Sequence, residues 1–184
     1  MSSSRIPFYS VKGTHYECAR TVGSLTREAI EKRIDLDQVD FSVLFDFVKT
    51  DSGRKILDDF SEQIRSIYPW YWDEFVGLAD GSQIPLERIL VLNLINELRT
   101  GFHENQLANR GCSSVLINRK DTNVLSILHN EDHSFALYEG GYLLEADIQS
   151  SEYENGQRKS PKEKFLAFCC AGSIPGQMSF ILFC

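Results

Sequence analysis

The chain has no long apolar run, no basic region and no Asn-x-Ser/Thr acceptor sequence. No stretch approaches the roughly 20 apolar residues that a membrane-spanning helix needs, and residues 1–7 lack the apolar core of a signal peptide. The net charge is −7, and acidic side chains outnumber basic ones on both sides of Cys112. These absences argue against a membrane partner and against a nucleic-acid partner, which would require a basic surface.

The use of cysteine also argues against a secreted, disulfide-rich protein. The chain has five cysteines, an odd number, and two of them, Cys169 and Cys170, are adjacent. Small secreted domains typically carry an even number of spaced cysteines that pair with one another. We therefore expect a reduced, cytoplasmic protein.

The pattern of apolar residues changes from helical to strand-like at Cys112. Before this residue apolar side chains recur at spacings of three and four, and after it short β-prone runs alternate with polar turns. A length of 184 residues suits one ordinary domain, and the change of pattern predicts an α+β fold. The expected helices are 14–34, 41–47, 55–78 and 85–98, and the expected strands are 6–12, 113–118, 124–130, 141–149 and 164–171.

Local signals add detail to the helical part. Thr14 and Glu17 have the spacing of a capping box, which predicts that the first helix begins there. Gly23 inside this helix indicates close packing against another element. Pro69 predicts a break within the long apolar pattern of residues 55–78.

Cys112 is the strongest candidate for a reactive residue. It follows Gly111 and opens an apolar, β-prone run. Cysteine is intrinsically the most nucleophilic side chain at neutral pH. If the Gly111–Cys112 peptide bond were cut, Cys112 would carry a thiol and a free α-amine, whose reference pKa of about 7.7–8.0 suits a general base. A buried strand cysteine remains the alternative, because free cysteine usually packs as a small apolar side chain.

Two further groups of residues suggest chemistry less strongly. His129, Glu131 and His133 alternate along an expected strand and would share a face, an arrangement that can present metal ligands. Their spacing is not that of the helical His-Glu-x-x-His zinc motif, and a polar strand face is the simpler interpretation. Cys169–Cys170 lie among apolar residues, which favours packing over redox chemistry. We expect no metal and no cofactor.

Six short segments are spread along the chain: Met1–Ser4, Gly13–Glu17, Gly77–Gly81, Gly111–Ser114, His129–Asp132 and Cys170–Gly176. In these segments the chain resembles the acyl-coenzyme A:6-aminopenicillanate acyltransferase family of N-terminal-nucleophile hydrolases. Within this family it is most similar to the branch that hydrolyses β-alanyl-dopamine and β-alanyl-histamine (carcinine). The resemblance extends to about Phe180.

The resemblance implies a fold, a processing step and a reaction. The fold would be a four-layer αββα sandwich, and the precursor would cut itself between Gly111 and Cys112. Residues 1–111 would form the helical pro-segment, or α chain, and residues 112–184 the start of the β chain. Cys112 would be the nucleophile, and Asp132 would orient the α-amine or its hydrogen-bond partners. The substrate would be a small β-alanyl amine, from which β-alanine is released without a cofactor.

The C-terminal end departs from the family pattern. Family members are longer, and the apolar run Ser179–Cys184 leads to no further expected strand. We therefore expect the chain to be the N-terminal part of such a protein, with an incomplete sandwich. The alternative hypothesis is a truncated, catalytically inactive isoform that acts as an interaction or regulatory fragment, for example by associating with the full-length form.

Overall fold

The computed structural model describes residues 6–101, 112–131, 139–151, 160–175 and 182–183, which form a mixed α+β fold as the sequence predicts. The helices are α1 (His15–Leu36), α2 (Gln38–Phe47), α3 (Asp51–Ile67), α4 (Pro69–Ser82), α5 (Leu86–Asn93) and α6 (Ile95–Gly101). The strands are β1 (Phe8–Gly13), β2 (Cys112–Arg119), β3 (Val124–Glu131), β4 (Gly141–Ile148), β5 (Glu163–Cys170) and β6 (Leu182–Phe183).

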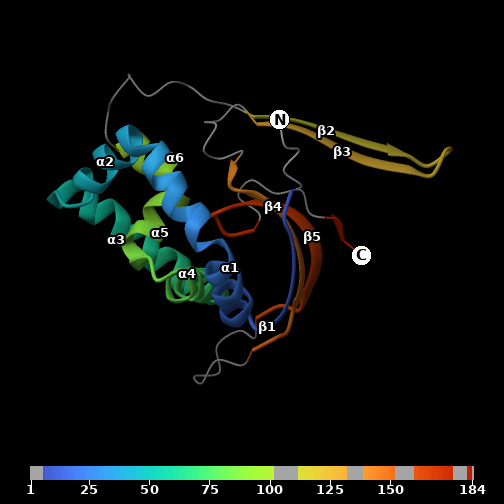
Figure 1. Cartoon of the computed structure of the whole chain (residues 1–184), viewed down its shortest axis with the longest axis horizontal. Coiled ribbons are helices and arrows are strands. Elements are labelled where there is room, and N and C mark those ends of the chain that lie inside the picture. Colours follow the sequence, from blue (N-terminus) through green and yellow to red (C-terminus); the bar gives the residue numbers. More distant parts are fainter. Residues whose placement is uncertain (1–5, 102–111, 132–138, 152–159, 176–181, 184) are drawn as a thin grey trace.

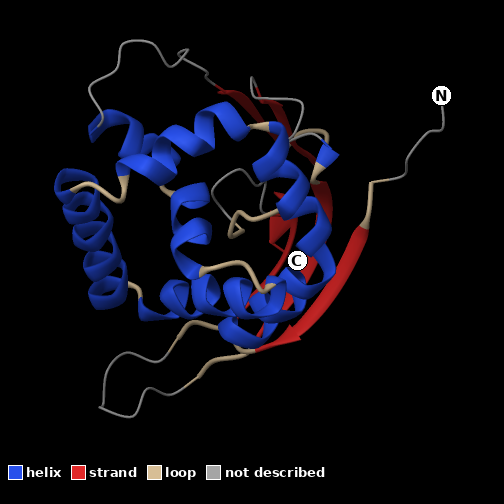
Figure 2. Cartoon of the chain, turned by 60° about the vertical axis from the view of Figure 1, so that its left-hand side comes forward, coloured by secondary structure: helices blue, strands red, loops and turns tan. Residues whose placement is uncertain are grey.

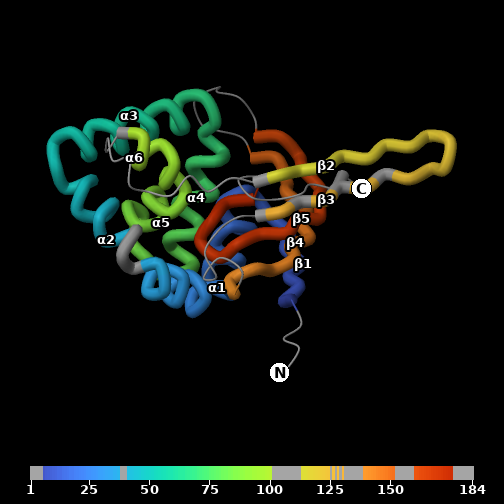
Figure 3. Tube along the Cα trace, turned by 90° about the horizontal axis from the view of Figure 1, so that it is seen from above, coloured from blue at the N-terminus to red at the C-terminus, as the bar shows by residue number. Residues whose placement is uncertain are grey.

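The strands form two separate sheets. A four-stranded sheet has the order β1-β4-β5-β6, in which β1 is parallel to β4 and the other pairs are antiparallel. β2 and β3 form an antiparallel hairpin of their own. The helices cover one face of the larger sheet (Figure 2), and the hairpin projects from the opposite side (Figures 1 and 3). The hairpin begins beyond one end of the larger sheet and extends away from it (Figure 1).

The core lies between the helices and the inner face of the larger sheet. Alternate residues of β4 are buried there because successive strand residues point to opposite faces. Buried apolar residues of α1, α4 and α5 complete this core. The members contributed by β4 are Tyr142, Leu144, Ala146 and Ile148. None of the helices in the described ranges combines the length and the apolar character that crossing a membrane requires.

α1 begins where the capping box predicts. The backbone N–H of Glu17 donates to Thr14 Oγ1 (3.3 Å), and the backbone N–H of Thr14 donates to Glu17 Oε2 (2.8 Å). These bonds satisfy two donors that the first turn of a helix leaves free. The predicted break at Pro69 is also confirmed, since α3 ends at Ile67 and Pro69 is the first residue of α4.

α1 and α4 pack closely because glycine lies on both of them. A Cβ atom on Gly23 of α1 would lie 2.5 Å from the carbonyl oxygen of Leu78 and 2.9 Å from the backbone nitrogen of Ser82. A Cβ on Gly81 of α4 would overlap the backbone of Arg20. The close packing that Gly23 indicates is thus confirmed, and α4 is its partner.

Gly23→Ala is expected to lower the free energy of unfolding by about 2 kcal/mol, because the new methyl group meets backbone atoms that cannot turn aside. In a helix without this contact, alanine would be more stable than glycine by up to about 1 kcal/mol. Destabilisation by Gly23→Ala would therefore indicate the close contact between the helices. Urea unfolding followed by circular dichroism measures it. Ser24→Ala, at the exposed neighbouring position, is the matched control and should be nearly neutral. A stabilised Gly23→Ala protein would contradict the close helix contact.

One expectation about the later part of the chain is wrong. The single helix expected over 85–98 is two helices, with Leu94 between α5 and α6. The side chain of Asn93 has partners outside the helix at this point: its Nδ2 donates to the carbonyl of Gly172 (2.7 Å), and its Oδ1 accepts from the N–H of Ile174 (2.9 Å). Within the apolar C-terminal run, β6 pairs with Phe165–Leu166 of the preceding strand β5.

Candidate functional site

Cys112 is the first residue of β2, at the point where the sequence predicts the chain to change from helices to strands. Its register partner across the hairpin is Glu131, the last residue of β3. The backbone therefore brings the start of β2 to the residue that directly precedes Asp132 in the sequence. Gly111, Asp132 and His133 lie outside the described residues, so the predicted roles of Gly111 and Asp132 stay predictions.

The hairpin that begins at Cys112 exposes apolar side chains on both of its faces. Val115 and Leu128 are register partners and are 53% and 55% exposed, whereas Leu116, on the other face of β2, is 69% exposed. Val124 is also exposed. A strand with apolar residues on both faces is typical of one that is covered on both sides. The hairpin thus has the apolar composition of strands that are buried on both faces, although its apolar side chains are exposed in this structure.

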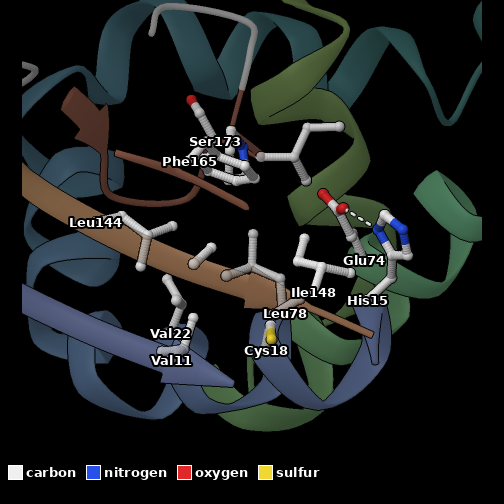
Figure 4. A pocket seen from close by; sticks show the side chains of 14 residues that line it. Val11, His15, Cys18, Val22, Glu74, Leu78, Leu144, Ile148, Phe165 and Ser173 are labelled. Atoms are coloured by element: carbon white, nitrogen blue, oxygen red, sulfur yellow. Dashed lines mark hydrogen bonds and ion pairs between the residues drawn. The ribbon is translucent and has the colours of Figure 1, made fainter. Parts of the chain in front are cut away.

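The structure also brings together three reactive residue types that the sequence analysis did not combine. His15 and Cys18 lie one turn apart on α1, and Glu74 comes from α4. His15 Nδ1 and Glu74 Oε1 are 2.5 Å apart, and both side chains are buried. Figure 4 shows this pair at one edge of a small apolar cavity, with Cys18 on another part of the lining. The spacing of His15 and Cys18 is a local signal, but nothing local connects them to Glu74.

This buried group does not have the properties of a nucleophilic centre. Burial and the nearby Glu74 carboxylate raise the pKa of the Cys18 thiol to about 11, so the thiolate needed for attack is scarce at neutral pH. His15 Nε2 has no hydrogen-bond partner among the described residues, so it does not activate Cys18. The cavity measures about 20 Å³, which is room for about one water molecule. No three His, Cys, Asp or Glu side chains of the described ranges are grouped as metal ligands.

In the parent protein, Glu74 is expected to make the free energy of unfolding fall as the pH rises. Glu74→Gln should remove this pH dependence. Burial raises the pKa of the Glu74 carboxyl above its ordinary 4.5, although its hydrogen bond to His15 and the charge of His15 lower it. Between these two pKa values the folded protein holds more protons than the unfolded chain. The free energy of unfolding of the parent therefore falls as the pH rises from about 4.5 through the folded-state pKa. Urea unfolding measured from pH 4 to pH 7 detects this contribution and its loss.

Glu17→Gln provides a control of opposite sign. Hydrogen bonds from Thr14 lower the pKa of the Glu17 carboxyl, so its contribution to stability is present above pH 4.5 and is lost as the pH falls. In the parent protein Glu17 therefore makes the free energy of unfolding increase with pH, and Glu74 makes it decrease with pH. Each replacement should remove the contribution of its own residue. Identical pH profiles for the two variants would contradict the assignment.

The turn that follows β5 is held by side chains of two helices. Arg33 of α1 is 2% exposed, and its Nη1 donates to the carbonyl of Ala171 (2.7 Å) and to the Ser173 hydroxyl (3.0 Å). Asn93 of α5 binds the next carbonyl of the turn, that of Gly172, which has a left-handed φ of 84° that suits glycine. The segment Cys170–Gly176, recognised in the sequence by its pattern, therefore begins as a turn fixed from the helical side.

Comparison with known proteins gives one distant relation. No family model matches the chain. The chain is 26% identical over 174 residues to a Drosophila melanogaster protein named beta-alanyl-dopamine/carcinine hydrolase, and the match covers 93% of this chain and 44% of that protein. The chain thus spans less than half of the length of this relative, to which it is distantly related.

Proposed function

We propose that this chain belongs to a hydrolase that releases β-alanine from small β-alanyl amines, with Cys112 as its nucleophile. The relative's name supports the substrate class, since that protein is named for β-alanyl-dopamine and carcinine. The observation that carries the choice of residue is the position of Cys112, which opens β2 opposite the end of β3. If the peptide bond before it is cut, a nucleophile at the first residue of a strand also carries the free α-amine at the start of that strand.

The reaction needs both groups of an N-terminal cysteine. For cleavage, Cys112 Sγ attacks the carbonyl carbon of Gly111, the bond from this carbon to the Cys112 nitrogen breaks, and the Gly111 acyl group is held as a thioester on Sγ. Water hydrolyses this thioester, which leaves a carboxyl group on Gly111 and a free thiol and α-amine on Cys112. In turnover this amine takes the thiol proton while Sγ attacks the substrate's amide carbonyl carbon. The carbon–nitrogen bond then breaks, the departing amine receives the proton, and β-alanine remains as a thioester on Cys112. Water hydrolyses the thioester, which releases β-alanine and restores the thiol. We propose that Asp132 orients the α-amine.

The arrangement of the elements supports a proposed αββα sandwich. The helices that cover one face of the larger sheet fit the first two layers of such a fold (Figure 2). The apolar residues on both faces of the hairpin fit a second sheet that is covered on both sides. In this proposal residues 1–111 form the helical α chain and residues 112–184 the start of the β chain.

Intact mass spectrometry of the purified protein tests the processing step directly. In the complete protein, the expected result is one fragment with the mass of residues 1–111 and a second fragment that begins at Cys112, together with release of β-alanine when carcinine is added; residues 1–184 alone, with an incomplete sandwich, are expected to release none. A protein that hydrolyses carcinine as one uncut chain would contradict autoprocessing. A cut protein that leaves carcinine and β-alanyl-dopamine intact would contradict the substrate.

A second function is favoured by the exposed apolar hairpin. Val115, Leu116, Val124 and Leu128 offer an apolar surface of the kind used to bind another polypeptide. A catalytically inactive chain of this kind would act as an interaction or regulatory fragment, with a full-length form as its partner. Co-expression of the two followed by size-exclusion chromatography with light scattering distinguishes a complex from independent proteins.

We also propose a cytoplasmic location. The sequence has an odd number of cysteines, two of them adjacent, which favours a reducing compartment over one in which disulfide frameworks form.

A further inference from the structure

The small cavity between α1, α4 and the larger sheet has one pair of ionisable side chains at its edge, and this pair joins the two helices. His15 Nδ1 and Glu74 Oε1 lie 2.5 Å apart (Figure 4), and the two side chains are 1% and 6% exposed. Apart from these two residues, Cys18 and Ser173, every residue that lines the cavity is apolar. The protonation of the pair therefore decides whether the cavity borders a net charge.

One proton makes the pair neutral as a whole, whether the imidazole or the carboxyl group carries it. An imidazolium would leave the N–H at His15 Nε2 without an acceptor in the described part of the chain, which favours the proton on Glu74. Loss of this proton leaves a carboxylate beside a neutral imidazole. A net negative charge in apolar surroundings is strongly disfavoured unless water reaches it.

The other groups that face Glu74 make this negative charge still less favourable. Glu163 of β5 and Asp73 of α4 act on Glu74 by their own negative charges, and together with burial they raise the pKa of its carboxyl group. The thiol of Cys18 and the phenol of Tyr71 have raised pKa values too, chiefly because of burial, and both are uncharged at neutral pH. No Lys or Arg of the described ranges forms an ion pair with Glu74.

The walls of the cavity differ in how readily they can give way. α1 and α4 are in backbone contact next to the pair, since a Cβ on Gly77 would lie 2.3 Å from the carbonyl oxygen of Tyr16. The helices therefore cannot separate there without loss of close packing. Another wall is the turn after β5, formed by residues 173–175. This turn is held through side chains, as in the bond from the N–H of Ile174 to Asn93 Oδ1 (2.9 Å), so it is the wall that can yield.

We propose that the His15–Glu74 pair is a proton-operated latch, which keeps the cavity closed while the pair is neutral and opens it to water at the turn of residues 173–175 when the pair loses its proton to the solvent. The cavity already has room for about one water molecule. Opening would also expose Cys18, whose side chain lies on the same lining (Figure 4). The latch involves none of the proposed catalytic residues and does not depend on the proposed function.

Labelling of the Cys18 thiol by methyl methanethiosulfonate, measured from pH 5 to pH 9 by peptide mass spectrometry, tests the latch. Attack needs the thiolate, whose share rises about tenfold per pH unit below the thiol pKa of about 11. Glu74→Gln imitates the protonated carboxyl group and can donate to His15 Nδ1, so its labelling rate should show this dependence alone. In the parent, opening adds the loss of a second proton, so the rate should rise about a hundredfold per pH unit until the latch is open.

Glu17→Gln is the matched control. The charge of Glu17 also acts on Cys18, but Glu17 does not line the cavity, so this variant should keep the steep dependence of the parent. A parent whose dependence is no steeper than that of Glu74→Gln would overturn the latch. The charge of an ionised Glu74 would by itself raise the pKa of Cys18 and flatten the curve, which is the opposite of the expected result.

Two further measurements locate the opening. Low urea should leave the labelling rate nearly unchanged, because a local opening exposes little surface, and a rate that rises with urea as steeply as global unfolding does would overturn the latch. Hydrogen exchange at the amide of Ile174, corrected for the intrinsic effect of pH, should be faster at pH 8 than at pH 6 in the parent and equal at both in Glu74→Gln. Exchange that does not change with pH in the parent would overturn the opening at the turn.

Discussion

In the complete protein, replacing Cys112 with serine is expected to abolish chain cleavage and to lower the rate of carcinine hydrolysis by roughly a thousandfold or more. A serine hydroxyl is a far poorer nucleophile at neutral pH than a cysteine thiol, and both proposed steps begin with attack by this side chain. Intact mass spectrometry reports the cleavage, and chromatographic measurement of released β-alanine reports the hydrolysis. Because this variant should not hydrolyse the amide bond, it also allows substrate binding to be measured without turnover.

Cys169→Ser and Cys170→Ser are the matched controls for this result. Both cysteines lie in β5 and are buried, so their replacement should affect folding and leave the chemistry intact. Activity should therefore be expressed per folded molecule, with the folded fraction taken from circular dichroism. Hydrolysis by Cys112→Ser within a few-fold of the parent would exclude Cys112 as the nucleophile.

The largest expected effect on stability is that of Arg33→Ala, which should lower the free energy of unfolding by about 3 kcal/mol. This guanidinium is almost fully buried, and the burial lowers its pKa. Its loss leaves the carbonyl of Ala171 and the hydroxyl of Ser173 without their donor and opens a void between α1 and the turn after β5. Urea unfolding monitored by circular dichroism measures the change.

Arg27→Ala is the control on the same helix. Arg27 forms an exposed ion pair with Glu31, and pairs of this kind contribute less than about 1 kcal/mol. Arg33→Lys should recover only part of the stability, because an ammonium group cannot reproduce the geometry of the guanidinium bonds. If Arg33→Ala were as mild as Arg27→Ala, the turn after β5 would not depend on Arg33.

Features set by neighbouring residues could be predicted from the sequence. The start of α1 follows from Thr14 and Glu17, and the division between α3 and α4 follows from Pro69, because each of these residues acts within one helical turn. The break at Leu94 gave no such signal. The apolar pattern continues through it, and the partners of Asn93 at this break lie about 80 residues further along the chain.

The same distinction applies to the candidate site. The sequence predicts Cys112 at the start of a strand, and the backbone confirms that position, while its chemical role stays a prediction. The pair of His15 and Glu74 could not be predicted, since it joins residues 59 positions apart through the packing of α1 on α4.

The parallel pairing of β1 with β4 has a consequence for how the protein would refold. β1 and all six helices precede Cys112, whereas β4 and β5 follow it, so the larger sheet joins residues from both sides of the proposed cut. After cleavage each fragment would hold only part of the core, and separating the fragments would amount to unfolding both. The uncut chain can recover from denaturant at a rate independent of its concentration. The cut protein would have to recover by a bimolecular encounter, so its refolding should slow on dilution.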